Sequence, residues 1–114
     1  MASKIPERKR AKKLESELKR WEGILRSEYH PHKIIIFGSY VEGKLKEWSD
    51  IDMVIVKDTK RPFLDRIKEV LSLLKPRVGL DVFIYTPQEF RNLCERRSFF
   101  REEILSKGIV KYAG

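Results

Sequence analysis

The 114-residue sequence predicts a small α/β (α+β) fold, in which helices pack against a β-sheet. Apolar runs of strand length alternate with segments that have the periodicity of amphipathic helices. Hydrophobic residues make up 41% of the chain, which is typical of a folded protein rather than a disordered one. The length suits one domain with a modest core, so we expect a single domain spanning residues 1–114. Periodicity leaves the order of the strands open.

The first predicted element is an amphipathic helix over about residues 6–28. Pro6 suits an early helical position, and apolar residues then recur in steps of three and four. These apolar residues are Ala11, Leu14, Leu18, Trp21 and Leu25. The helix should end before Pro31, because proline disfavours helical geometry at the residue before it. The apolar run that follows predicts a first strand over residues 33–37.

A short helix is expected next, over residues 39–46. Gly43 would lie inside it at some cost, so we expect this glycine to allow close packing or a close backbone approach. A second strand is predicted over residues 51–57. A second amphipathic helix should run from 63 to about 75, marked by Phe63, Ile67, Val70, Leu71 and Leu74.

The last third of the chain predicts a further strand over about residues 78–85. Thr86 and Glu89 flank Pro87 in the pattern of a capping box, which indicates the start of a helix. A last helix is expected over about residues 98–106, followed by a short edge strand over residues 109–112.

The net charge is +8, and residues 4–20 hold eight lysines and arginines against three glutamates. Such a basic face can bind polyanions, although a solvated helix surface is the simpler interpretation. We therefore expect nucleic acid to bind at most non-specifically. The apolar runs are too short to span a membrane, and the first residues lack the apolar segment of a secretory signal. A single cysteine, Cys94, fits a reducing compartment, so the expected location is cytoplasmic.

The most informative pattern lies between the first two strands. Gly38 and Ser39 follow the first strand, and Asp50 and Asp52 begin the second. Side chains at positions i and i+2 of a strand project from the same face, with Cα atoms about 6.6 Å apart. Two such carboxylates can share a pair of divalent cations, and a Gly-Ser pair before a helix can contact a phosphate. Taken alone, an Asp-x-Asp at the start of a strand more often marks a turn, in which the aspartate side chains bond to the nearby backbone.

Taken together, the spacing resembles the signature of the DNA polymerase β-like nucleotidyltransferases, G-S-x-x-x-G-x-x-x-x-x-S-D-x-D. The residues in register with it are Gly38, Ser39, Gly43, Ser49, Asp50 and Asp52. The chain length is similar to that of the minimal nucleotidyltransferases, the group of the MntA-like antitoxins. The resemblance covers a core of about residues 33–85. It implies a small mixed sheet with helices packed mainly on one face and the metal site on the other.

The resemblance also implies the roles of the site residues. Asp50, Asp52 and a third carboxylate, Asp81, would be catalytic and would bind two Mg²⁺ ions, for which Mn²⁺ could substitute. An alternative for Asp81 is a charge that protects an edge strand. The candidate nucleotide-binding residues are Gly38, Ser39, Ser49 and Lys44. Lysines at such positions are also commonly only solvated.

The sequence departs from the family at two positions. Many members carry arginines where this chain has Tyr40 and Glu42. Less positive charge beside the phosphates would weaken triphosphate binding and turnover. Lys44 and Lys46 could compensate in part.

The implied function is Mg²⁺-dependent transfer of AMP, or another nucleoside monophosphate, from a nucleoside triphosphate such as ATP to a hydroxyl acceptor. By resemblance, the partner would be a small helical HEPN-domain protein, with this chain as the antitoxin that adenylylates it. Two alternatives stay open: a catalytically weak module that neutralises a partner by binding, and a basic nucleic-acid-binding protein. Formation of a homo-oligomer is also left open.

Overall fold

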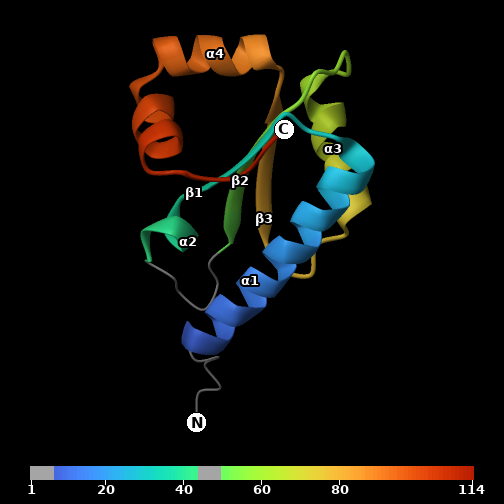
Figure 1. Ribbon diagram of the computed structural model, residues 1–114, viewed down its shortest axis with the longest axis vertical. Helices are drawn as coiled ribbons and strands as arrows, with labels where there is room; N and C mark the ends of the chain where they lie inside the picture. Colours follow the sequence, from blue (N-terminus) through green and yellow to red (C-terminus); the bar gives the residue numbers. More distant parts are fainter. Residues whose placement is uncertain (1–6, 44–49) are drawn as a thin grey trace.

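The computed structural model describes residues 7–43 and 50–114, and within these ranges the chain forms a four-stranded sheet. The strands are β1 (Lys33–Phe37), β2 (Ile51–Val56), β3 (Leu80–Tyr85) and β4 (Ile109–Ala113), in the order β3-β2-β1-β4. β1 is antiparallel to both β2 and β4, whereas β2 and β3 are parallel (Figure 1). The predicted mixed sheet is therefore confirmed.

One face of the sheet is covered by α1 (Glu7–Ile24), its wider continuation η1 (Leu25–Tyr29) and α3 (Phe63–Leu74). Alternate residues of each strand point to this face because successive side chains of a strand project to opposite sides. The larger core lies here. Its buried members are Leu14, Leu18, Trp21, Leu25, Tyr29, Ile34, Ile36, Ile51, Met53, Ile55, Val70, Leu74, Val82 and Ile84.

Polar contacts, one of them partly buried, hold α1 against the end of α3. The Arg20 guanidinium donates to the carbonyl oxygens of Leu74 and Lys75, which lie at the C-terminal end of α3. Helix ends leave such carbonyls without partners inside the helix. Arg20 also donates to Glu17, with Nε 2.7 Å from Oε2, and Glu17 accepts the backbone N–H of Arg77 at 2.7 Å. The basic first helix is thus partly a structural element, and its apolar stripe is buried against the sheet.

The opposite face is covered only in part, by α4 (Pro87–Arg96) and η2 (Phe100–Ser106) (Figure 1). A smaller core forms there from Ile35, Val54, Val56, Phe90 and Ile104. The predicted capping box begins α4: Thr86 Oγ1 accepts the Glu89 N–H at 3.2 Å, and Glu89 Oε1 accepts the Thr86 N–H at 2.8 Å. Helices therefore pack mainly on one face, as expected.

The prediction of a helix over residues 39–46 needs a correction. The helix α2 (Ser39–Glu42) ends at Gly43, which has a φ of 72°. A Cβ at Gly43 would meet no atom within 4 Å, so the expected close packing at this glycine is wrong. Glycine suits the position because it adopts a positive φ at little cost, a common way to end a helix. Residues 44–49 lie outside the described part of the chain.

Among the helices in residues 7–43 and 50–114, none is both long and apolar enough to cross a lipid bilayer.

Candidate active site

The pairing of β2 with β3 brings two of the predicted site residues together. Asp52 and Asp81 are direct partners in the parallel register, and neighbouring strands lie about 4.8 Å apart. Their carboxyl groups share a hydrogen bond. On the other side of Asp52, its antiparallel partner is Phe37 at the end of β1. Asp52 is therefore central and Asp81 lies beside it, although the two are far apart in sequence.

Asp50 lies one residue before β2 and is exposed. Its carboxylate lies against Gly79, where a Cβ would collide with it. The Gly79 carbonyl accepts the N–H of Ile51 at 3.0 Å, which holds the two segments together. In the described part of the chain, no three carboxylate, histidine or cysteine side chains are gathered closely enough to form a ready metal site. The structure thus brings Asp52 and Asp81 together and leaves Asp50 at their margin.

The environment of Asp52 is unfavourable for its negative charge. The pKa of Asp52 is raised from 3.8 to about 6, chiefly by burial and in addition by the charge of Asp81, the hydrogen bond with Asp81 and the charge of Asp50. Carboxylates crowded together resist ionisation unless a cation is nearby. The oxygen donors present here are the kind that Mg²⁺ prefers, so the residues fit a divalent cation.

Gly38 allows the turn after β1 to approach this carboxylate. Its φ is 82°, and a Cβ at this position would collide with Asp52. The Gly38 carbonyl accepts the N–H groups of Val41 and Glu42 at 3.1 and 3.0 Å, which begins α2. Ser39, the first residue of α2, is exposed next to this turn. The other two predicted nucleotide-binding residues, Lys44 and Ser49, lie outside the described residues.

A cavity of about 290 Å³ opens from the two aspartates across the sheet. It is lined by Phe37, Asp52, Val54, Asp81, Phe83, Tyr85, Phe99, Phe100 and Ile104. Phe83 is 36% exposed and Phe99 is 56% exposed, which is unusual for large apolar side chains. The sequence interpretation missed this aromatic wall. The alternation of Asp81, Phe83 and Tyr85 could have indicated it, because these residues share one face of a strand.

Tyr40 and Glu42 differ in their surroundings. Tyr40 packs against the larger core, and burial raises the pKa of its hydroxyl, with a further contribution from Glu15. Glu42 is exposed at the end of α2. Tyr40 therefore contributes to packing.

Known proteins of one family resemble this chain. A family model for the nucleotidyltransferase domain matches residues 18–111. The chain belongs to this family. A relative from Methanocaldococcus jannaschii named as a candidate protein adenylyltransferase, MJ0604, is 34% identical over 101 residues, covering 86% of this chain and 97% of the relative. The protein adenylyltransferase MntA of Haemophilus influenzae, also named as a candidate, is 35% identical over 77 residues, or 64% of this chain and 68% of that protein.

A solved structure shares the fold. The crystal structure of a candidate nucleotidyltransferase from Sulfolobus solfataricus superposes with a TM-score of 0.63 and 18% identity, covering 90% of this chain and 83% of that one. The recognised family and the predicted fold class are therefore confirmed. So is the assignment of the chain to the nucleotidyltransferase enzymes, whose substrates are nucleoside triphosphates.

Proposed function

We propose that this nucleotidyltransferase moves AMP from ATP onto a hydroxyl group of a partner protein in the cytoplasm. The observation that supports the proposal is the Asp52–Asp81 pair, which lines a cavity and in which the pKa of Asp52 is raised. The names of the relatives support the same transfer, because they describe protein adenylyltransferases.

Asp52 and Asp81 would hold Mg²⁺, or Mn²⁺ in its place, with Asp50 as a third ligand after a change of side-chain rotamer. The chemistry that a bound pair of such ions would supply is neutralisation of the charge on the transferring phosphate. The chain's own contribution is to orient the phosphates. Gly38 lets the backbone approach them, and the exposed Ser39 hydroxyl lies beside that turn. Ser49 and Lys44 stay candidate nucleotide-binding residues.

The acceptor comes from another protein. Tyr40 packs against the core instead of adding positive charge beside the phosphates. A partner could supply both the hydroxyl and a cationic side chain, as trans-acting arginines do in other phosphoryl transfers. We propose a small helical HEPN-domain toxin as this partner, with this chain as its antitoxin.

The test is incubation of the protein with α-labelled ATP, Mg²⁺ and the product of the neighbouring gene. We expect the label to appear on a tyrosine, serine or threonine of the partner, located by mass spectrometry. Asp81→Asn should abolish labelling, whereas Asp65→Asn on the exposed first turn of α3 should not. A stable complex that binds ATP but transfers no label would instead favour the non-enzymatic binding module.

A further inference from the structure

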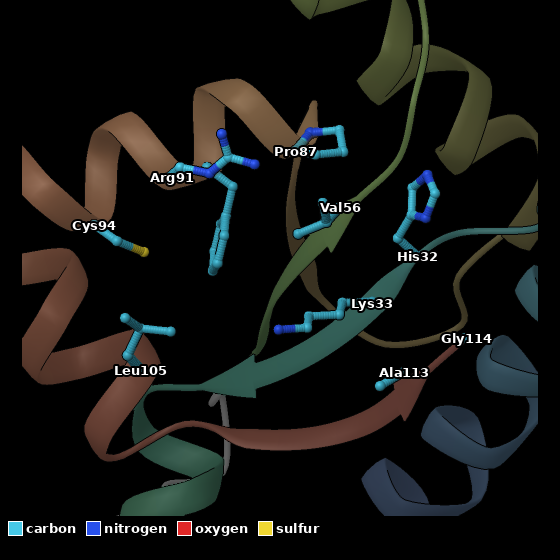
Figure 2. Close-up of a pocket in the computed structure, with 10 residues that line it drawn as sticks. His32, Lys33, Val56, Pro87, Arg91, Cys94, Leu105, Ala113 and Gly114 are labelled. Carbon is cyan, nitrogen blue, oxygen red and sulfur yellow. The ribbon is translucent and has the colours of Figure 1, made fainter.

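A second and larger cavity lies on the same face of the sheet as the aspartates but at its other end. Its volume is about 530 Å³, within the range of small-molecule sites. It is lined by His32, Lys33, Val56, Pro87, Phe90, Arg91, Cys94, Leu105, Ala113 and Gly114 (Figure 2). None of these residues lines the cavity at the aspartates.

The two cavities are separated along the strands. Lys33 pairs with Val56 at one end of the β1–β2 ladder, and Phe37 pairs with Asp52 at the other. Four residues of extended chain span about 13 Å. Ile35 and Val54, both buried, fill the sheet face between the two ends. The second cavity is therefore not an extension of the candidate active site.

The second cavity has a positive rim and an apolar floor. Figure 2 shows Lys33 extending from β1 and Arg91 from α4 on opposite sides of the opening, with His32 at its edge. The apolar lining comes from Val56, Pro87, Phe90, Leu105 and Ala113. No aspartate or glutamate side chain is among the residues that line it.

Two acidic residues of the covering elements are paired with basic side chains outside the cavity lining, whereas Glu95 of α4 lies near enough to act on Cys94. Glu89 of α4 pairs with Arg66, with Oε1 2.7 Å from Nη1. Glu103 of η2 pairs with Lys107 at 3.4 Å. Within the cavity, burial raises the pKa of the Cys94 thiol; the charges of Lys33 and Arg101 oppose the rise, and that of Glu95 adds to it. Figure 2 shows the Lys33 side chain extending from β1 into the cavity.

We propose that this cavity binds a small amphipathic anion, with a carboxylate or phosphate group held between Lys33 and Arg91 and an apolar body packed on Phe90, Val56 and Leu105. The planar guanidinium of Arg91 and the mobile ammonium of Lys33, on opposite sides of the cavity, can both donate hydrogen bonds to one anionic group. The apolar floor excludes highly solvated ions such as free phosphate as the best ligand, because burial of apolar surface supplies much of the affinity in such sites. The site does not depend on the proposed transfer reaction.

A pair of fluorescent probes tests the proposal. Anilinonaphthalene sulfonate carries an anionic group on an apolar body, and phenylnaphthylamine is a neutral counterpart. We expect the double variant Lys33→Met, Arg91→Met to bind the anionic probe about tenfold or more weakly, because the charge-assisted contacts of the probe are lost. Its affinity for the neutral probe should change little. The matched control is Lys111→Met with Arg96→Met, which removes two exposed charges of β4 and α4 outside the cavity lining. If both double variants lose the same affinity for the anionic probe, the proposal is overturned.

Competition then distinguishes the sources of the anionic group. Displacement of the bound sulfonate probe by naphthoate indicates a carboxylate ligand, and displacement by AMP but not by inorganic phosphate indicates a phosphate ester. Displacement by inorganic phosphate alone, at the same concentration, contradicts an amphipathic ligand.

The chain carries its own reporter of occupancy, since Cys94 is its single cysteine and lines this cavity. Saturating the protein with the anionic probe should slow alkylation of Cys94 by iodoacetamide several-fold. The same probe should give no protection in the Lys33→Met, Arg91→Met variant at that concentration. An unchanged alkylation rate in the wild-type protein, under conditions where the probe is bound, would place the probe elsewhere and overturn the assignment.

Discussion

Two acidic side chains on opposite faces of the sheet have opposite environments. Glu17, on the face covered by α1 and α3, is 5% exposed and is held by Arg20 and by the N–H of Arg77. The hydrogen bond from Arg20 is the main reason that the pKa of Glu17 falls to about 2. Asp52, on the face only partly covered by α4 and η2, has other carboxylates for neighbours, and its pKa rises to about 6.

The difference separates a structural charge from a functional one. The Glu17 carboxylate has hydrogen-bond donors within the fold, so its ionised form contributes to stability. Asp52 is ionised at a cost, which a cation bound as we propose would relieve. Active sites commonly carry such unfavourable charge, because groups arranged for catalysis are not arranged for stability.

The largest expected effect concerns catalysis. Asp52→Asn should lower AMP transfer at least about a thousandfold, which corresponds to ~4 kcal/mol of transition-state stabilisation. The reason is that the amide cannot supply the negative charge that a divalent cation needs. Initial rates with α-labelled ATP measure this. Asp58→Asn, in the exposed loop directly after β2, is the control and should retain full activity. Equal rates for both variants would remove Asp52 from the chemistry.

How far the sequence predicted the fold depends on how local each signal is. The first strand was predicted with its observed bounds, because a run of β-branched residues before Gly38 identifies it. The capping box at Thr86 was likewise confirmed, since the residues that form it lie within the four-residue segment 86–89. The end of α2 was predicted wrongly. Gly43 was expected to allow close packing or a close backbone approach, whereas its positive φ ends the helix, and sequence periodicity does not report backbone dihedral angles.

The candidate site was predictable in part for the same reason. Asp50 and Asp52 are two residues apart, so strand geometry predicted a shared face, but Asp50 lies one residue before β2 and its carboxylate lies against Gly79. Asp81 was placed only by resemblance, because a parallel pair such as β2–β3 is joined through a long crossover whose register no local pattern reports. The aromatic wall was missed because Phe99 and Phe100 reach Asp81 only through the packing of η2 on the sheet.

The second prediction tests the structural side of the comparison. Glu17→Gln should lower the free energy of unfolding by ~2 kcal/mol at pH 7, because Arg20 loses its charged partner. This figure is smaller than the pKa difference alone implies, since solvent screens part of the interaction. Chemical denaturation measures it. Glu15→Gln is the matched control on the same helix: Glu15 pairs with Lys19 at the exposed surface, and its loss should cost under about 0.5 kcal/mol.

The Glu17 contribution should also have a definite pH dependence. The folded pKa of about 2 lies below the ordinary value of 4.5, so the stabilisation is complete above pH 4.5 and is lost as the pH falls toward 2. The difference in unfolding free energy between wild type and Glu17→Gln should therefore shrink over that window. A difference that stays constant from pH 6 to pH 2.5 would contradict an electrostatic origin.

A smaller effect is expected on metal binding. With a pKa of about 6, Asp52 is mostly protonated at pH 5 and mostly ionised at pH 7.5. Metal binding competes with protons, so the affinity for Mn²⁺ alone should fall about tenfold between pH 7.5 and pH 5. Titration followed by electron paramagnetic resonance of free Mn²⁺ measures this without nucleotide, whose own phosphates titrate in the same range. A flat profile would show that the ionisation of Asp52 does not control metal binding.

The smallest expected effect is a gain in stability. Asp52→Asn should raise the free energy of unfolding of the metal-free protein by ~1 kcal/mol at pH 8, after allowance for the partial exposure of the side chain. The sign follows from the raised pKa: the folded state binds the proton more tightly than the unfolded chain, so wild-type stability falls as the pH rises from 3.8 through 6. At pH 3.5 both states carry a largely protonated Asp52, so the gain should nearly vanish.

Saturating Mn²⁺ should make the wild type the more stable of the two proteins, because the metal stabilises only the wild type strongly. Thermal unfolding at both pH values, with and without Mn²⁺, gives the four comparisons needed. If Asp52→Asn destabilises the metal-free protein at pH 8, then Asp52 is a structural charge like Glu17, and the contrast between the two faces fails.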